Sequence, residues 1–118
     1  MPQYMLLLHD DPTAFASVSP EDIQRIIEKY MAWGDRLKKA GILADSHKLT
    51  DEPGRVMRGR EGKVRVTDGP YSESKEVLGG YFTIAAASYD EAVERARDCP
   101  HLDYGGTIEV RQVDTMGQ

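Results

Sequence analysis

The sequence has few of the features that mark disulfide-rich, membrane or nucleic-acid-binding proteins. Cys99 is the single cysteine among 118 residues, which excludes an internal disulfide and a multi-cysteine zinc or iron–sulfur site. The longest purely apolar runs, Met5–Leu8 and Ile84–Ala87, are far shorter than the ~20 residues that a membrane span needs. Twenty acidic residues against fifteen Lys and Arg give a net charge of −5. This balance argues against a dedicated nucleic-acid binder, since such proteins hold phosphates with cations.

The remaining composition is that of one globular domain. With 40% hydrophobic residues, 118 residues are enough for a single core, and we expect one domain over residues 1–118. The first eight residues carry no Lys or Arg and are too short for a signal peptide. We therefore expect a cytoplasmic protein without a membrane segment.

Capping residues and apolar spacing predict two helices and several strands. Ser19 and Pro20 are typical of a helix start, Gly41 is typical of a helix end, and Ser88 with Glu91 forms a capping box for a second helix. The predicted order is strand Gln3–His9, helix Ser19–Ala40, strand Ile42–Thr50, a hairpin of Arg55–Arg58 and Lys63–Thr67, strand Tyr81–Ala87, helix Tyr89–Cys99 and strand Thr107–Val113.

This order predicts an α+β fold of the ferredoxin-like type (the dimeric α/β-barrel arrangement), an antiparallel sheet with two helices on one face. The other face is then left without helices. Because its strands are apolar, we expect it to be covered, most simply by a second copy of the chain in a homodimer.

The segment Val66–Phe82 reads VTDGPYSESKEVLGGYF. It closely resembles the signature of the DGPF subgroup of the YCII-related domain family, in which T-D-G-P-F-A-E-T-K-E precedes a short spacer and G-G-Y. Met5–Asp10, Ser46–Leu49 and Gly106–Arg111 resemble the family's first strand, its S-H-x-L segment and its closing strand. The resemblance covers nearly the whole chain, and Tyr71 departs from it by adding a hydroxyl where the pattern has Phe.

The resemblance implies a ferredoxin-like fold, dimers formed by sheet packing, and a cleft with a histidine and an acidic residue as the catalytic pair. Many members of the family have no assigned reaction. Some genes of the subgroup lie beside genes for extracytoplasmic-function sigma factors, which implies a regulatory link. The family thus fixes the fold much better than the function.

Three residues are candidates for acid–base chemistry. His9 ends the first strand, His47 lies in the S-H-x-L segment, and Asp68 precedes the stiff Gly69–Pro70 turn. An imidazole whose tautomer is fixed by a carboxylate suits proton transfer, and a His9–Asp68 pair is one possible arrangement. The alternative is a purely structural role, in which the histidines make hydrogen bonds within the fold and Asp68 caps a tight turn.

Further candidates follow Asp68 along the chain. Tyr71, Glu73 and Lys75 are expected at the rim of the cleft as substrate contacts, although a run of charges is more often a solvated turn. Cys99 is expected to be structural, and His101 is expected to be exposed in a loop beside Pro100. No pair of histidines has the spacing of metal ligands, so no metal or other cofactor is predicted.

The segment Arg55–Arg65 is the one basic stretch. Five cations against Glu61 give it a charge of +4, so the rest of the chain carries −9. It is interpreted as the exposed edge of a hairpin, where charges block unwanted strand pairing. The alternatives are an anion-attracting patch beside the cleft and a docking surface for an acidic partner.

Two functions remain open. The first is a small dimeric enzyme without a cofactor, which uses a His/Asp pair for lyase- or isomerase-type proton transfer on a small anionic or aromatic substrate. The second is a non-catalytic module that binds a small molecule or regulates a protein partner, such as a sigma factor. Whether the protein is an enzyme is left undecided by the sequence.

Overall fold

The computed structural model describes residues 1–69 and 76–115. The elements in chain order are β1 (Gln3–Asp10), α1 (Pro20–Lys39), β2 (Leu43–Lys48), β3 (Arg55–Arg60), β4 (Lys63–Asp68), β5 (Val77–Ala85), α2 (Tyr89–Ala96), the 3-10 helix η1 (Pro100–Tyr104) and β6 (Thr107–Gln112). Among the described residues, neither helix combines the length and apolar character that crossing a bilayer requires.

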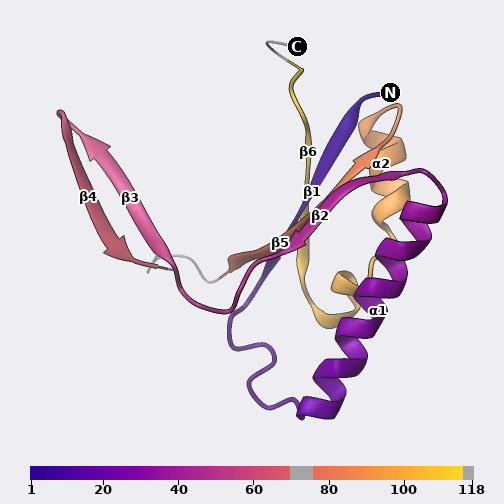
Figure 1. Cartoon of the computed structure of the whole chain (residues 1–118), viewed down its shortest axis with the longest axis horizontal. Helices are drawn as coiled ribbons and strands as arrows, with labels where there is room; N and C mark the ends of the chain where they lie inside the picture. The colour runs from indigo at the N-terminus through magenta and orange to yellow at the C-terminus, as the bar shows by residue number, and fades with distance from the viewer. Residues whose placement is uncertain (70–75, 116–118) are drawn as a thin grey trace.

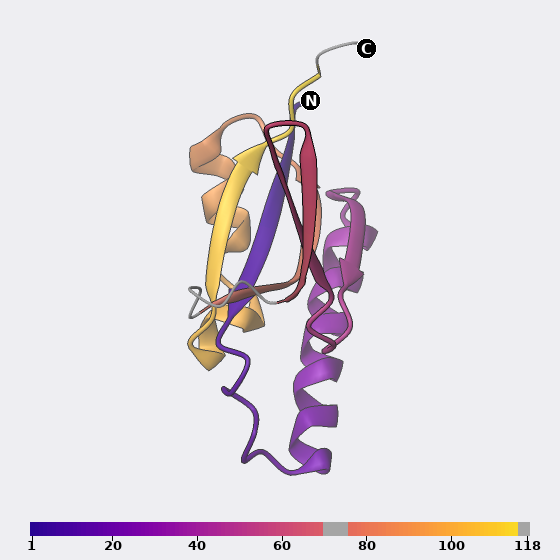
Figure 2. The ribbon, with the colours of Figure 1, turned by 90° about the vertical axis from the view of Figure 1, so that its left-hand side faces the viewer.

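The main sheet has four antiparallel strands in the order β2-β5-β1-β6. Both helices lie on one side of it, and the opposite side faces away from them (Figures 1 and 2). This arrangement is the predicted α+β, ferredoxin-like one, with two helices on one face of an antiparallel sheet.

Local sequence signals explain where the helices begin and end. The hydroxyl of Ser19 accepts a hydrogen bond from the backbone N–H of Asp22 at 3.2 Å, so Ser19 is the predicted N-cap of α1. Gly41 has a φ of +74°, the left-handed backbone geometry that often ends a helix and that glycine adopts most easily. The hydroxyl of Ser88 accepts from Glu91 N–H at 3.2 Å, and the Glu91 carboxylate accepts from Ala87 N–H at 3.1 Å.

The core lies between the main sheet and the helices. Its centre is Leu6 of β1 and Ile84 of β5, which are both fully buried. They lie diagonally across the strand pair, since Leu6 pairs with Phe82 and Ile84 with Tyr4. Trp33 of α1 is almost fully buried and packs edge-on against Phe82, with ring centroids 4.9 Å apart. The helix packing therefore uses this large ring to fill the space between α1 and β5.

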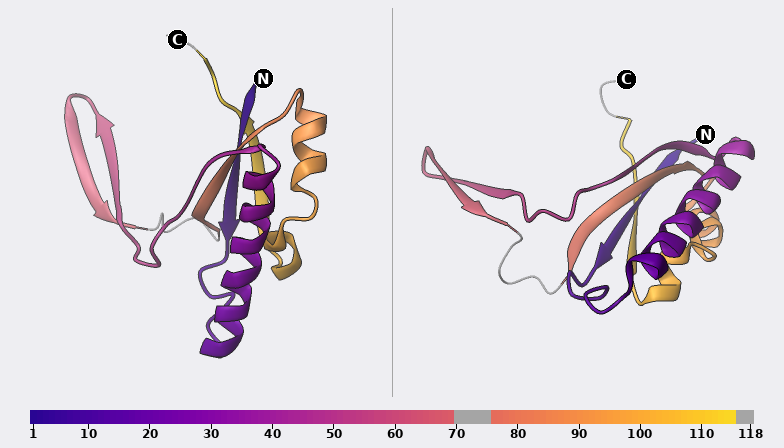
Figure 3. Two further views of the ribbon diagram at one scale, coloured as in Figure 1. Left: turned by 45° about the vertical axis from the view of Figure 1, so that its right-hand side comes forward. Right: turned by 60° about the horizontal axis from the view of Figure 1, so that its bottom comes forward.

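The strands differ from the prediction in the start of β5 and in the position of the hairpin. β5 begins at Val77, four residues before the predicted start, and its pairing with β1 shifts between Leu8 and His9. A side chain on Gly80 would place its Cβ 2.9 Å from the His47 carbonyl oxygen, so glycine allows β2 and β5 to approach closely here. β3 and β4 form a separate two-stranded sheet that stands away from the rest (Figure 3).

Candidate functional site

The side of the main sheet without helices carries both histidines that the sequence singled out for acid–base chemistry, His9 and His47. Alternate residues of a strand point to opposite faces, and Tyr4, Leu6 and Leu8 of β1 are buried on the helix side. The residues between them and their register partners therefore share the other face, which we call the open face. It comprises Met5, Leu7 and His9 of β1, Asp45 and His47 of β2, Tyr81 and Thr83 of β5, and Glu109 and Arg111 of β6.

His9 and Glu109 form an imidazole–carboxylate pair on the open face. His9 Nε2 lies 3.1 Å from Glu109 Oε1, and the side chains keep 28% and 44% of their surface exposed. Arg111 Nη1 donates to the other carboxylate oxygen at 3.3 Å. The bonds from His9 and then from Arg111 hold the pKa of Glu109 below its ordinary value, so the carboxylate is charged at neutral pH.

A second cluster lies on the same face at the β2 edge. Tyr81 donates its hydroxyl hydrogen to Asp45 Oδ2 at 2.9 Å, and His47 Nε2 lies 3.4 Å from Asp45 Oδ1. The His47 and Tyr81 ring centroids are 5.8 Å apart. The hydrogen bond to Asp45 raises the pKa of the Tyr81 hydroxyl, because ionisation would break that bond.

The two clusters flank a narrow apolar strip. His47 pairs with Tyr81, Tyr81 with Leu7, and Leu7 with Glu109, so these four residues form one row across the sheet. Three strand spacings of about 4.8 Å separate the ends of the row by about 14 Å. His9 and His47 therefore cannot act together on one atom, but each can contact one end of the same small molecule.

Asp68 is not brought to either histidine. It ends β4 in the separate two-stranded sheet, where its carboxylate lies 3.3 Å from Arg55 Nη1 and is largely exposed. The His9–Asp68 pair that the sequence allowed is therefore not formed, since β4 pairs only with β3 among the described strands. The predicted contacts Tyr71, Glu73 and Lys75 lie outside the described residues.

A third histidine, His101, is buried, so the expectation of an exposed loop residue was wrong. Its Nε2 lies 2.8 Å from the His9 carbonyl oxygen, and its Nδ1 lies 2.8 Å from the Tyr30 hydroxyl. Because a carbonyl oxygen only accepts, Nε2 donates its hydrogen to the His9 carbonyl, while Nδ1 shares a hydrogen bond with the Tyr30 hydroxyl. The ring thus ties η1 to α1 and to the end of β1, just behind the His9 side chain.

Asp10 lies next to this buried ring, on the helix side of the sheet end. Burial raises the pKa of its carboxyl, while the nearby charges of His101 and Lys48 act in the opposite direction. The neighbouring Gly106 leaves room for the ring, since a Cβ there would lie 2.3 Å from His101 Nε2. The Gly105–Gly106 pair after Pro100–His101 was the sequence signal for a tightly packed ring, and it was missed.

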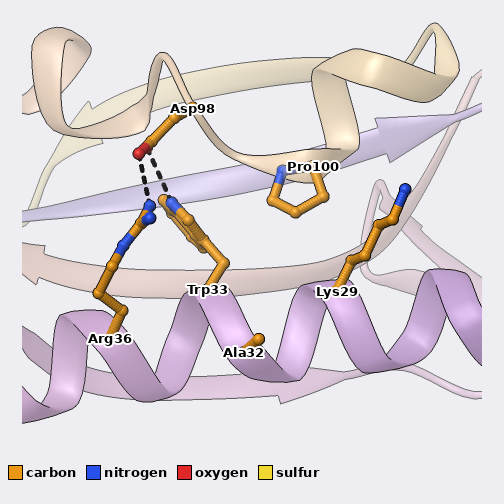
Figure 4. Close-up of a pocket in the computed structure, with 6 residues that line it drawn as sticks. All are labelled: Lys29, Ala32, Trp33, Arg36, Asp98 and Pro100. Carbon is orange, nitrogen blue, oxygen red and sulfur yellow. Dashed lines mark hydrogen bonds and ion pairs between the residues drawn. The ribbon is translucent and has the colours of Figure 1, made fainter.

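A shallow pocket lies on the helix side, between α1 and the segment 98–100, and none of its lining residues belongs to the open face (Figure 4). Asp98 sits at its edge and accepts from Trp33 Nε1 at 2.9 Å while it pairs with Arg36. Two donors from α1 already hold this carboxylate, so its evident role is to fasten α1 to the chain after α2. Within residues 1–69 and 76–115, no three His, Cys, Asp or Glu side chains gather in a metal-binding group.

Comparison with known proteins agrees with the fold. Residues 2–116 match the YCII-related domain. The chain belongs to the YCII-related domain family. It is also 32% identical over 110 residues to an uncharacterised protein of Rhizobium meliloti (strain 1021), an alignment that covers 92% of this chain and 89% of that protein. The family predicted from the sequence is thus confirmed, and the function of this YCII-related domain has to be argued from its own residues.

Proposed function

We propose that the open face of this YCII-related domain is an acid–base site for a small molecule, with His9 and Glu109 as the working pair. The observation that carries the proposal is the 3.1 Å contact between an imidazole nitrogen and a carboxylate oxygen on a half-exposed face. A carboxylate that accepts from Nε2–H makes Nδ1 the basic nitrogen of the ring. Glu109 takes the orienting role for which the sequence had suggested Asp68.

The reaction class that suits this pair is proton transfer at carbon. His9 would remove a proton from a carbon next to a carbonyl group, and the electron pair would remain on the substrate as an enolate. Return of the proton to a different atom gives an isomerase-type reaction, and departure of a leaving group gives a lyase-type reaction. Such general acid–base catalysis contributes typically about 10²–10⁴-fold to a rate.

The surroundings of the pair favour a small anionic substrate with an apolar or aromatic body. Leu7 and Met5 form the strip between the two clusters, and the Tyr81 ring lies beside it. Arg111 adds a cation at the β6 edge that can attract a carboxylate. His47, with Asp45 behind it, would contact the far end of the bound molecule.

The same face also supports the second function, binding without chemistry. The flat, exposed setting of both histidine clusters favours it, because a catalytic site usually excludes water. In this function the open face would sense a small molecule, and a protein partner would respond to the loaded form. Binding and chemistry are separable in one experiment.

That experiment is deuterium exchange followed by proton NMR in D2O, with a panel of small aliphatic and aromatic oxo acids. We expect wild-type protein to exchange an acidic C–H of at least one compound, His9→Gln to lose this activity by about 100-fold or more, and Glu109→Gln to lose part of it. Glu94→Gln is the matched control, since Glu94 lies on α2, away from the open face, and its carboxylate pairs with Arg97.

The outcomes distinguish the two functions. Binding of a panel compound that shifts the His9 resonances without any exchange would refute the catalytic proposal and favour the sensing module. Absence of both binding and exchange across the panel, or equal losses in Glu109→Gln and Glu94→Gln, would refute the site itself.

A further inference from the structure

The buried ring of His101 contacts the backbone beside both strands that carry the His9–Glu109 pair. At the end of β1, its Nε2–H donates to the His9 carbonyl at 2.8 Å. At the start of β6, the ring lies against Gly106, where an added Cβ would meet Nε2, Cδ2 and Cε1 at 2.3, 2.4 and 2.6 Å. One side chain therefore touches the place where β1 ends and the place where β6 begins.

The sheet itself supports β1 less at His9 than along the rest of the strand. Leu8 pairs with Gly80 but His9 pairs with Leu78, so the register against β5 shifts by one residue at this point. His9 is also the last residue of β1 that pairs with β6. A shift in register interrupts the hydrogen-bond ladder and bends the strand locally. The bond from His101 is thus an additional restraint where the ladder gives few.

His101 is itself fixed by the helix layer. The residue is buried, and its Nδ1 shares a hydrogen bond with the Tyr30 hydroxyl of α1 at 2.8 Å. The two rings also lie in edge contact, with centroids 6.0 Å apart. The N–H of Gly106 donates to the His101 carbonyl at 3.1 Å and closes η1 against the start of β6. The ring therefore relates the position of α1 to the position of the His9 backbone.

The His9–Glu109 pair depends on how β1 and β6 lie relative to one another. The two residues are diagonal neighbours on adjacent strands, since His9 pairs with Thr107 and Glu109 with Leu7. The 3.1 Å between Nε2 and Oε1 is near the upper end of the hydrogen-bond range, and both side chains are partly exposed to competing water. A small rotation at the end of β1 would therefore break the contact.

We propose that His101 is the positioning residue of the His9–Glu109 pair. Its bond to the His9 carbonyl holds the end of β1 so that the His9 ring keeps one orientation, with Nε2 on Glu109 and Nδ1 directed away from it. This role rests on the proposed function only in that Nδ1 of His9 is named there as the base. A ring that merely filled space at the end of the sheet would not need a donor at this carbonyl.

The two nitrogens of His101 can be replaced one at a time. The side-chain amide of glutamine reaches the place of Nε2, so His101→Gln can keep the bond to His9 but loses the bond to Tyr30. The shorter amide of asparagine reaches only the place of Nδ1, so His101→Asn can keep the bond to Tyr30 but loses the bond to His9. Because both variants remove the ring, we expect both to lose stability to a similar extent in urea unfolding.

The orientation of the His9 ring is measured by NMR on the full chain without ligand. Three-bond couplings from the His9 Cγ to its backbone nitrogen and carbonyl carbon report whether χ1 occupies one staggered rotamer or several. We expect one rotamer in wild type and in His101→Gln, and averaging over several in His101→Asn.

The Glu109 carboxyl gives a second readout. The bond from His9 holds the pKa of Glu109 below its ordinary value, with a smaller contribution from Arg111. In a carbon NMR titration we expect this pKa to rise in His101→Asn, toward its value in His9→Gln, and to stay near the wild-type value in His101→Gln.

A second pair of variants keeps the His101 ring in place of its substitution. Gly106→Ala puts a methyl group 2.3 Å from Nε2 and displaces the donor, whereas Tyr30→Phe removes only the partner of Nδ1. We expect averaging of the His9 χ1 in Gly106→Ala and one rotamer in Tyr30→Phe. Circular dichroism checks that each variant folds, and this pair decides the question should a His101 variant fail to fold.

A His9 ring that behaves alike in His101→Gln and His101→Asn, or alike in Gly106→Ala and Tyr30→Phe, would overturn the positioning role, since a merely structural ring affects both members of a pair equally. Averaging of the His9 χ1 in wild type would overturn it as well. These measurements need no substrate. Absence of C–H exchange in wild type, with a His9 ring that follows His101, would refute only the proposed function. Loss of exchange in His9→Gln, with a His9 ring that is independent of His101, would refute only the positioning role.

Discussion

Substitution of Gly106 by alanine tests the role of the buried His101 ring most directly. A methyl group at this position would lie 2.3 Å from His101 Nε2 and 2.4 Å from its Cδ2, far inside van der Waals contact. The ring has little freedom to move away, because it is 4% exposed and is held by Tyr30 and by the His9 carbonyl. Gly106 does not have a positive φ, so the effect of alanine is steric.

The size of the effect follows from these contacts. Overfilling a packed site costs about 1–3 kcal/mol, and each of the two hydrogen bonds of His101 contributes about 1 kcal/mol. We expect Gly106→Ala to lower the free energy of unfolding by about 2–4 kcal/mol. His101→Ala should cost a similar amount, since it opens a cavity and leaves the Tyr30 hydroxyl and the His9 carbonyl without their partner.

The double variant makes this prediction specific. With the ring removed, the Gly106→Ala methyl group has free space, so His101→Ala/Gly106→Ala should be about as stable as His101→Ala alone. Urea unfolding at one fixed protein concentration, followed by the fluorescence of the buried Trp33, measures all four proteins. If the loss of stability in the double variant equals the sum of the two single losses within about 0.5 kcal/mol, the direct clash is refuted. The effects of substitutions are additive at independent sites but not at sites in contact.

Two further predictions concern titratable groups on the helix side. Burial raises the pKa of the Cys99 thiol to about 11, so we expect Ellman's reagent at pH 8 to label it only through unfolding, and rapid labelling of the native protein would contradict its placement. Burial also raises the pKa of the Asp10 carboxyl, so the folded state binds the carboxyl proton more tightly than the unfolded state does. The stability that the protonated carboxyl confers is therefore lost as the pH rises above about 4, the ordinary pKa of an aspartate. Asp10→Asn should therefore be more stable than wild type at pH 7, with an advantage that shrinks as the pH of urea unfolding falls toward about 4; an advantage independent of pH would exclude the carboxyl as its source.

The fold was predictable because its signals are local. Ser19, Gly41 and Ser88 mark helix ends through hydrogen bonds and backbone angles that depend on a few neighbouring residues. The continuous apolar run Met5–Leu8 is typical of a central strand, and β1 lies between β5 and β6. The hairpin was also predicted, but not its separation from the sheet, since the sequence does not show where the connections at 49–54 direct it.

The candidate site was only partly predictable because its pairs join distant segments. His9 and His47 were singled out, but Glu109 is 100 residues from His9 and carries no local mark that distinguishes it from other exposed acids. It reaches His9 only because β6 pairs with β1 in one particular register. His101 was misplaced for the same reason, since only the packing of η1 against α1 and β6 buries a segment that a proline would otherwise place in an exposed loop.

The distribution of apolar residues differs between the two sides of the main sheet. On the helix side the core is complete within one chain, as the fully buried Leu6 and Ile84 show. On the other side, the open face and the β3–β4 hairpin each carry apolar residues next to charged ones, and within residues 1–69 and 76–115 neither covers the other. A molecule that covers the open face would lower the dielectric constant around His9 and Glu109, where each charge interaction then becomes stronger.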